Sequence, residues 1–152
     1  MTPSKMREKV VVERAKWISQ MLDGLRSLPL NNYRAFSSDP RNFASAESYL
    51  RRSLEALLDL GRHVLAKGFG GAVTEYKQIS SELLKFGILS KENSEKLRLL
   101  AGYRNRMVHF YHEISNHELY EICSKELGDI EQVLEDILTW IKNHPDMIDK
   151  TL

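Results

Sequence analysis

Apolar residues recur at intervals of three and four along most of the sequence, and no stretch of useful length alternates apolar with polar residues. Such spacing places side chains on one face of a helix, whereas strands need alternation. Segments rich in Pro, Gly, Asn and Ser separate these stretches and favour turns. We therefore expect an all-α fold, an up-and-down bundle of four to five helices. The spacing predicts helices at about residues 7–27, 42–67, 74–86, 90–112 and 116–143.

Residues that commonly begin or end helices mark several of these boundaries. Thr74, Ser90 and Ser115 each precede an apolar stripe, and their hydroxyl groups can cap a helix N-terminus. Glu118, three residues after Ser115, completes the form of a capping box. Gly87 is placed to end a helix in the left-handed conformation. The stretch LPLNNYRAFSSDPRN, between the first two predicted helices, has the composition of a loop.

The length and composition suit one domain with a substantial core, because the chain has 152 residues and 42% of them are hydrophobic. We expect a single helical domain over residues 1–152. Cys123 is the only cysteine, so an internal disulfide is impossible and a reducing compartment is suitable. The chain does not begin with a signal-peptide pattern, and no window has the ~18 apolar residues of a membrane span. The sequence thus predicts a cytoplasmic protein without a membrane segment.

Charge is unevenly distributed along the chain, although the formal net charge is only +1. Residues 96–106 contain four basic residues and no acid, whereas residues 118–136 contain seven acids and a single lysine. A net charge near zero neither predicts nor excludes a nucleic-acid partner, because local patches decide such binding. The basic residues of the first segment are Lys96, Arg98, Arg104 and Arg106.

The stretch YRNRMVHFYHE, residues 103–113, inserts charged and polar residues into a helix that otherwise carries core positions. On an ideal helix Arg104 falls in the middle of an apolar arc, while Asn105 and His109 project from another side. A guanidinium on an apolar face is costly unless it is paired or reaches a wet cavity. A group outside this helix must therefore accommodate Arg104. The other members of the arc are Leu97, Leu100, Ala101, Val108 and Tyr111.

Three kinds of role are compatible with these residue types: a metal site, a structural pairing and a phosphate site. Zinc-binding helices place two ligands four residues apart, whereas His109 and His112 are three apart and His117 lies beyond a predicted helix break, so we expect no metal. Spacing alone favours a structural interpretation, in which Arg104 pairs with an acid and Tyr111 belongs to the core. In the functional interpretation Arg104 and His109 form a phosphate site, with arginine supplying charge and histidine moving a proton.

A family resemblance favours the functional interpretation. The stretch RNRMVHFYHE has Arg104, four intervening residues, His109, one residue and then Tyr111, and it resembles the signature of the HEPN superfamily, specifically of the HepT-like toxins. The segments SLEALLDLGRHVLAK, YKQISSELLKFGILS and GYRNRMVHFYHEIS are also similar to that family. Together they extend the resemblance over most of residues 7–143. Asn105 directly after the arginine makes the match more specific.

The resemblance implies a metal-independent endoribonuclease toxin of a type II toxin–antitoxin pair, which cleaves RNA through attack of the ribose 2′-hydroxyl. It implies a homodimer in which two motif helices meet and a MntA-like nucleotidyltransferase antitoxin as partner, with no cofactor. By this resemblance Arg104 and His109 are the catalytic residues and Asn105 supports them. The resemblance further implies that the antitoxin AMPylates Tyr111 and so blocks the groove that admits RNA.

The second predicted helix contributes neighbours to this site. We expect Asp59 and Arg62 to lie close to the motif, with Asp59 able to pair with Arg104 in the resting protein. One alternative is a non-catalytic HEPN module that binds or adapts a nucleotidyltransferase. Another is a structural helical-interaction protein, in which replacing Arg104 by alanine leaves every activity unchanged.

Overall fold

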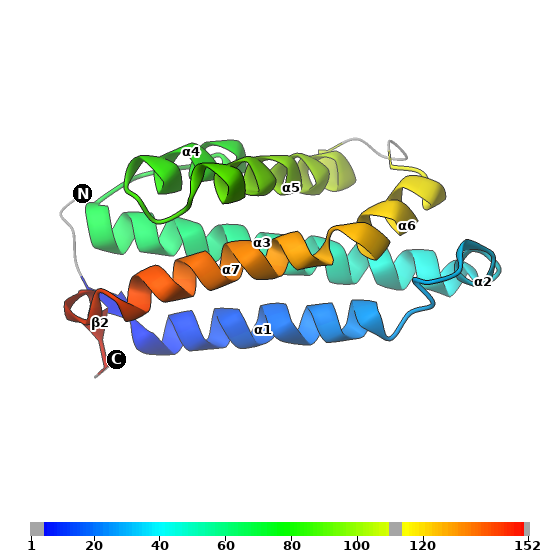
Figure 1. The fold of residues 1–152 in the computed structure, drawn as a ribbon, viewed down its shortest axis with the longest axis horizontal. Coiled ribbons are helices and arrows are strands. Elements are labelled where there is room, and N and C mark those ends of the chain that lie inside the picture. Colours follow the sequence, from blue (N-terminus) through cyan, green and yellow to red (C-terminus); the bar gives the residue numbers. More distant parts are fainter. Residues whose placement is uncertain (1–4, 110–113, 151–152) are drawn as a thin grey trace.

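The prediction of an all-α bundle is confirmed by the computed structural model, which describes residues 5–109 and 114–150 (Figure 1). Among these residues there are seven α-helices, more than the four to five expected. Two very short strands and one turn of 3-10 helix lie at the ends of the described chain. The helices are α1 (Glu8–Arg26), α2 (Tyr33–Ser37), α3 (Pro40–Phe69), α4 (Tyr76–Lys85), α5 (Lys91–His109), α6 (Asn116–Lys125) and α7 (Leu127–Lys142).

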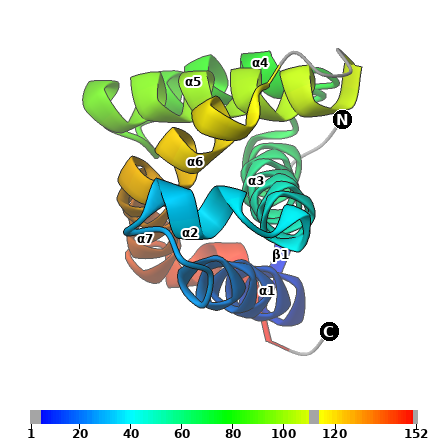
Figure 2. The ribbon, with the colours of Figure 1, turned by 90° about the vertical axis from the view of Figure 1, so that its right-hand side faces the viewer.

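Helix α3 runs along the middle of the molecule, with α1 on one side and the α4–α5 pair on the other (Figures 1 and 2). This central position agrees with its burial, because the buried residues of α3 occur on several sides of the helix rather than on one stripe. Twelve of its thirty residues are buried. The largest contribution to the core comes from its leucines, each of which stabilises the fold by about 1.5–3 kcal/mol when fully buried. These are Leu50, Leu54, Leu57, Leu58, Leu60 and Leu65.

Two of the predicted N-terminal caps are confirmed. The Ser90 hydroxyl oxygen accepts a hydrogen bond from the backbone N–H of Asn93 at 3.1 Å, which begins α5. The Ser115 hydroxyl oxygen accepts one from the N–H of Glu118 at 3.1 Å, which begins α6. Gly87 has φ +74° directly after the end of α4, as its position predicted. These boundaries depend on groups within three residues of one another, so the local sequence suffices to specify them.

Several other boundaries were predicted wrongly. Helix α4 begins at Tyr76 rather than Thr74, and its N-cap residue Glu75 makes no side-chain capping bond. The expected loop contains α2, which Asn32 caps by accepting a hydrogen bond from an N–H of that helix. The single helix expected over 116–143 is interrupted at Glu126, whose φ of −116° and ψ of 7° lie outside the helical range. Helix α3 also continues two residues beyond the predicted end, to Phe69.

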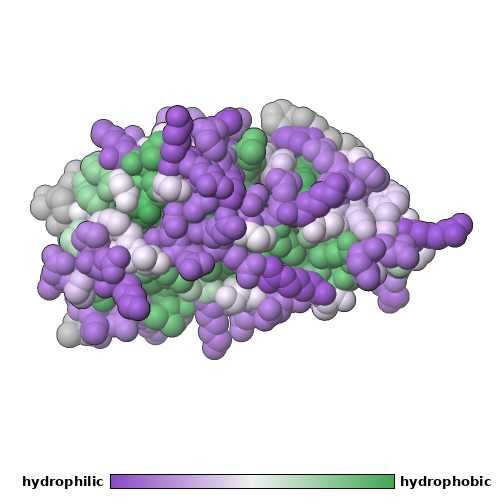
Figure 3. All heavy atoms as spheres, viewed as in Figure 1, coloured by the Kyte–Doolittle hydropathy of each residue, from purple (hydrophilic) through white to green (hydrophobic). Residues whose placement is uncertain are grey.

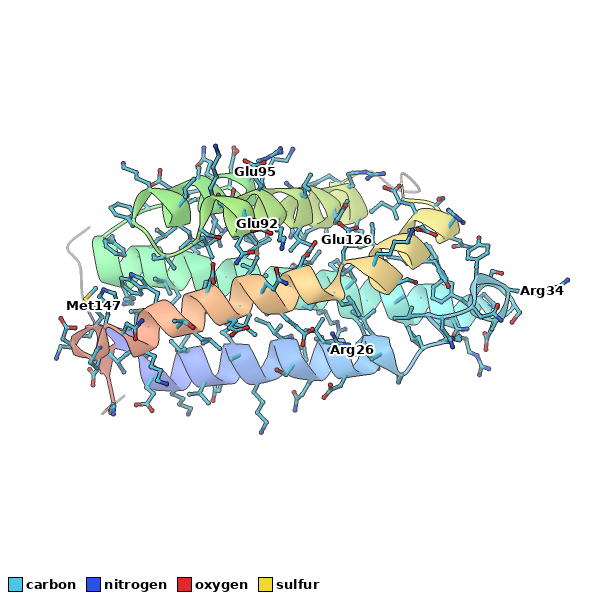
Figure 4. The ribbon with its side chains drawn as sticks, viewed as in Figure 1. Arg26, Arg34, Glu92, Glu95, Glu126 and Met147 are labelled. Atoms are coloured by element: carbon cyan, nitrogen blue, oxygen red, sulfur yellow. The ribbon has the colours of Figure 1, made fainter. Side chains whose placement is uncertain are left out.

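The two ends of the described chain meet in a short parallel pairing that no sequence pattern predicted. Strand β1 (Met6–Arg7) pairs with β2 (Ile148–Asp149), and the turn η1 (Pro145–Met147) leads into β2. Met147 lies at this end of the bundle, where its Cε atom approaches the C-terminal part of α3 (Figure 4). Met6 is fully buried, so the pairing extends the core rather than forming a separate sheet.

Polar side chains cover most of the face seen in Figure 3, with apolar side chains gathered in separate patches. An ion pair between Arg26 of α1 and Glu131 of α7 joins two helices on this surface (Figure 4). None of the described helices combines the length and the apolar composition that crossing a membrane requires.

Candidate active site

The motif residues lie in the second half of α5, where the helix is only partly buried. Leu97, Leu100 and Ala101 are buried, as the apolar arc predicted. The Arg104 side chain on the same arc keeps 18% of its surface exposed. Its Nη2 donates to Glu55 Oε2 of α3 at 3.2 Å. Arg104 is therefore paired and also retains access to solvent, which meets both conditions for a guanidinium on an apolar face.

Next to Arg104 the surface is hollowed into a cavity of about 460 Å³, which we call the motif cavity. Three elements form it: α3, the start of α4 with the two residues before it, and α5. The cavity brings together four of the residues predicted from sequence: Arg62, Arg104, Asn105 and His109. Tyr111, the predicted modification site, lies outside the described residues. The remaining lining residues are Thr74, Glu75, Tyr76 and Lys77.

Tyr76, which the sequence analysis missed, lies between the two arginines of the motif cavity. The Cζ atom of Arg104 is 4.6 Å from the centre of the Tyr76 ring, and that of Arg62 is 4.8 Å from it. Both distances are within the range of a cation–π interaction. The phenol donates a hydrogen bond to Asp59 Oδ1 at 2.8 Å. One aromatic side chain from α4 thus contacts cations from α3 and α5.

The predicted pairing of Asp59 with Arg104 is wrong. Asp59 accepts the hydrogen bond from Tyr76, and its Oδ1 lies 3.6 Å from Nη1 of Arg62. Arg104 pairs instead with Glu55, which lies four residues earlier on the same face of α3. The Tyr76 side chain occupies the hydrogen-bonding position at Asp59 that Arg104 was expected to fill. Asp59 therefore acts on the cavity through Tyr76 and Arg62 without lining it.

The charge of Arg104 is only partly balanced by its partner. Glu55 also accepts a hydrogen bond from Arg51 at 2.9 Å, so its carboxylate is shared between two guanidinium groups. Among the described residues, the buried Nε atoms of Arg62 and Arg104 have no hydrogen-bond partner. Arg104 Nη1 donates to Asn105 Oδ1 at 3.3 Å, which links the two neighbouring motif residues. Two guanidinium groups therefore line the cavity, beside the carboxylate of Glu75 and the ammonium group of Lys77, and their positive charge suits an anion.

Burial raises the pKa of Tyr76 to about 12, and its hydrogen bond to Asp59 acts in the same direction. The phenol is therefore neutral throughout the physiological pH range, because its ordinary pKa is already near 10. A neutral ring keeps its negative π face toward both guanidinium groups without adding a charge to the cavity. The raised pKa thus keeps Tyr76 in the role of a hydrogen-bond donor.

His117 and Cys123 lie outside the lining of the motif cavity. No group of three or more His, Cys, Asp or Glu side chains is arranged to hold a metal ion among residues 5–109 and 114–150. His117 contacts the Tyr33 ring and Glu121, away from the motif cavity, and His112 lies outside the described residues. Cys123 is buried, and this burial raises the pKa of its thiol to about 12, so the thiol stays protonated at neutral pH.

Two residues of the site, Glu55 and Tyr76, were not identified from the sequence. A signal for Glu55 existed, because it precedes Asp59 by four residues and so shares its face of the second predicted helix. No comparable signal existed for Tyr76. Its role depends on how α4 packs against α3 and α5. The predicted helix start at Thr74 was two residues too early, so it did not establish which face of α4 carries Tyr76.

Solved structures share this fold. The tri-AMPylated HEPN toxin of Shewanella oneidensis, in complex with an MNT antitoxin, is similar with a TM-score of 0.77 and 20% identity, over 86% of this chain and 97% of that one. YutE of Bacillus subtilis, a cytosolic protein of unknown function, is similar with a TM-score of 0.78 and 15% identity, over 93% of this chain and 94% of that one. At these identities the likeness establishes the fold alone.

Sequence comparison adds a nearer relative and the family. The tRNA nuclease HepT of Aphanizomenon flos-aquae (strain 2012/KM1/D3) is 27% identical over 118 residues, which are 77% of this chain and 80% of that protein. The model of the HepT-like family, described as ribonuclease HepT-like, matches residues 13–137. Since this match spans most of the sequence and includes every residue of the motif cavity, the chain belongs to the HepT-like family.

Proposed function

We propose that this protein is the toxin of a toxin–antitoxin pair, a metal-independent endoribonuclease whose catalytic residues are Arg104 and His109. The observation that carries the proposal is the gathering of Arg62, Arg104 and His109 at one cavity, although they come from two helices. A cavity with two guanidinium groups and an imidazole suits a phosphodiester that must be bound and then cleaved by proton transfer. Family membership and the tRNA nuclease relative support the same chemistry.

In this proposal an RNA phosphate binds where Arg104 and Arg62 converge. Both guanidinium groups contact the Tyr76 ring, and both arginines line the same cavity. Guanidinium groups bind non-bridging phosphate oxygens through charge-assisted hydrogen bonds. Arg104 stabilises the negative charge that increases on these oxygens in the transition state. Asn105 limits the motion of the Arg104 guanidinium through their hydrogen bond.

The reaction needs no metal, because the nucleophile belongs to the RNA. The 2′-hydroxyl oxygen forms a bond to the adjacent phosphorus, and the bond from phosphorus to the 5′-oxygen breaks. His109 takes the proton of the 2′-hydroxyl, and the departing 5′-oxygen receives a proton from a second acid. The products are a 2′,3′-cyclic phosphate and a free 5′-hydroxyl. DNA lacks the 2′-hydroxyl and is not cleaved.

A homodimer supplies the second acid in this scheme. His109 is exposed at the end of α5, so an isologous contact can bring a second copy of this histidine into the same groove. Two histidines then share the tasks of base and acid. Light scattering should give twice the 17.6 kDa of one chain. A mass of 17.6 kDa during active cleavage would remove the second histidine from the mechanism.

We propose that a MntA-like nucleotidyltransferase antitoxin in the cytoplasm regulates this protein by attaching AMP to Tyr111. AMP attached to this tyrosine would add bulk and phosphate charge two residues beyond His109. Phosphate charge near Arg104 competes directly with that of RNA, so the modified protein should not cleave. The modified HEPN toxin of Shewanella oneidensis supports this assignment as a related case.

The deciding experiment is RNA cleavage in the presence of EDTA. Purified protein and the His109→Ala variant are incubated with labelled tRNA. This substrate is chosen because the related HepT protein of Aphanizomenon flos-aquae is a tRNA nuclease. A short single-stranded RNA and its 2′-deoxy counterpart are incubated alongside, and products are analysed by mass spectrometry. We expect cyclic-phosphate products from RNA with the wild type alone.

Two results would contradict the proposal. Equal cleavage by His109→Ala would exclude this histidine from proton transfer. An inert wild type, with an intact mass that excludes attached AMP, would instead favour a non-catalytic HEPN module that binds a nucleotidyltransferase. The intact-mass measurement is therefore made before the cleavage assay.

A further inference from the structure

A second hollow lies beside the motif cavity, on the outer surface of α4 and α5. It has a volume of about 300 Å³ and is called the α4–α5 groove. Lys77 lines both hollows, so they adjoin at the start of α4. The volume is at the lower end of the range for small-molecule sites. The lining residues are Lys77, Arg98, Leu99, Gly102, Tyr103 and Arg106.

Gly102 forms part of the floor of this groove. A Cβ atom added at Gly102 would meet no heavy atom within 4 Å, so the floor of the groove is open above the helix backbone. Leu99, one turn earlier, keeps 49% of its surface exposed. The Tyr103 ring is fixed on the other side, because its hydroxyl donates to Glu126 at 3.0 Å. The groove therefore has an apolar floor and an aromatic side chain held in place at one edge. A planar ring such as a nucleotide base can pack against this floor.

The rim of the groove is basic, and none of its six lining residues is acidic. Arg98 is paired with Glu95, Nη2 to Oε2 at 3.0 Å, and Glu95 lies on the outer side of α5 (Figure 4). Arg106 is paired with Glu118 of α6 through two contacts of 2.7 Å. Lys77 makes no ion pair with any residue that the structure describes. Exposed pairs such as Arg98 with Glu95 are weak and exchange readily for another anion.

We propose that the α4–α5 groove is a subsite for one nucleotide of the RNA flanking the cleaved phosphate. This inference rests on the proposed nuclease function. The base lies over Gly102 between Leu99 and Tyr103, and its phosphate contacts Lys77 and Arg98. Gly102 precedes His109 by seven residues, which is about 10 Å along a helix. A strand that enters the motif cavity can therefore continue over Lys77 into the groove.

Charge favours RNA over a second copy of the chain as the occupant. A two-fold contact through this groove would bring two copies of Lys77, which has no acidic partner among the described residues, toward each other, and these like charges would repel. A nucleotide has the opposite charge, together with an apolar face for the floor. Single-stranded nucleic acid is commonly held in this way, by cations along the backbone and by stacking or packing against its bases.

The test compares oligonucleotides that fill one hollow or both. The probes are fluorescent 2′-O-methyl oligonucleotides of two and eight nucleotides, which lack the nucleophilic 2′-hydroxyl. Their affinity is measured for the wild type, Gly102→Leu and Gly102→Ala. Leucine fills the groove, whereas alanine adds a Cβ where nothing lies within 4 Å. We expect Gly102→Leu to weaken binding of the eight-nucleotide probe by about tenfold, in line with the loss of one stacked base, and to leave the two-nucleotide probe unchanged. Gly102→Ala adds a single Cβ to the floor, so it should weaken binding of the eight-nucleotide probe by less than Gly102→Leu does and leave the two-nucleotide probe unchanged.

Charge is tested separately through Arg98, which does not line the motif cavity. Arg98→Gln should reduce the slope of log affinity against log salt by about 0.7 for the eight-nucleotide probe, as expected for one lost phosphate contact. Glu95→Gln is the matched control, because it frees Arg98 from its acid and should strengthen binding of the same probe. An unchanged slope in Arg98→Gln would overturn the phosphate contact.

The outcomes separate this inference from the nuclease proposal. If Gly102→Leu binds both probes as the wild type does and cleaves RNA normally, the subsite is overturned and the nuclease stands. If the wild type cleaves nothing but binding of the longer probe still depends on Gly102, the nuclease is overturned and the groove remains a nucleotide site. If Gly102→Leu changes the mass in light scattering from dimer to monomer, the groove is a subunit contact and the inference is wrong.

Discussion

The two halves of α5 differ in what holds them to the rest of the molecule. All four buried residues of this helix lie between Lys91 and Ala101, and none of the residues 102–109 is buried. In the second half Tyr103 and Met107 are only partly buried against the core. Polar contacts add to this packing: Arg104 to Glu55, Arg106 to Glu118 and Tyr103 to Glu126. Packing holds a helix more strongly than partly exposed ion pairs do. One helix thus combines a structural half with a half whose polar groups remain available to a ligand.

The largest expected effect is on catalysis, in the second half. His109→Ala should lower the rate of RNA cleavage by about 10²–10⁴-fold, the range for loss of a general acid or base. Because His109 is exposed, the melting temperature should stay within the error of the wild type. Cleavage rate and thermal unfolding are measured on the same preparation. A variant that loses both would place His109 among the structural residues.

The first half should give the reverse result. Leu100 is 1% exposed, and Leu100→Ala should lower the free energy of unfolding by about 2–5 kcal/mol. The neighbouring Leu99 is half exposed, so Leu99→Ala serves as the matched control and should change stability by less than about 0.5 kcal/mol. Urea unfolding measures both values. Similar values for the two variants would mean that burial does not distinguish these neighbouring positions.

Tyr76 connects the second half of α5 to α3, and its replacement should affect activity more than stability. Tyr76→Leu removes the ring that contacts Arg62 and Arg104, and we expect cleavage to fall by about tenfold, equivalent to about 1.4 kcal/mol. Tyr76→Phe keeps the ring and loses the hydrogen bond to Asp59, so it should retain most of the activity. If the phenylalanine variant is as poor as the leucine variant, the hydroxyl matters and the ring does not.

Gly61 in the buried helix α3 and Gly102 in the second half of α5 allow the same contrast between packed and open positions to be tested. A Cβ at Gly61 of α3 would lie 2.9 Å from Cγ2 of Ile79, so Gly61→Ala should destabilise the protein by about 1 kcal/mol after its gain in helix propensity. Gly102→Ala meets no neighbour and should stabilise the protein by about 0.5–1 kcal/mol. Both are measured by chemical denaturation. Destabilisation by Gly102→Ala would mean that the groove is filled by another part of the protein.

The smallest effect concerns the ion pair of Arg106 with Glu118. The hydrogen bonds from Arg106 lower the pKa of Glu118 below its ordinary value of 4.5. A carboxyl whose pKa is lower in the folded protein stabilises it above pH 4.5, and this contribution is lost as the pH falls further. Glu118→Gln should therefore cost less than about 1 kcal/mol at pH 7 and less again at pH 3 than at pH 7. Melting temperatures of both proteins at the two pH values test this difference.

Features that depend on neighbouring residues were predicted well from the sequence. The caps at Ser90 and Ser115 and the glycine conformation at Gly87 need only groups a few residues away. The break at Glu126 was missed because apolar spacing continues through it, and nothing nearby in the sequence requires a bend. The pairing of β1 with β2 was missed because two-residue strands carry no periodic pattern.

The candidate site divides in the same way. The sequence by itself determined the all-α class and the position of Arg104 on an apolar arc, since both follow from the helical repeat. The motif from Arg104 to His109 was recognised through its resemblance to the HepT-like toxins. Only the tertiary structure decided that Glu55 rather than Asp59 pairs with Arg104, and that Tyr76 lies between two arginines. The physical reason is that α3 and α4 contribute these groups across 49 and 28 positions of the chain from Arg104. Contacts over such separations are set by how the helices pack, which no local pattern encodes.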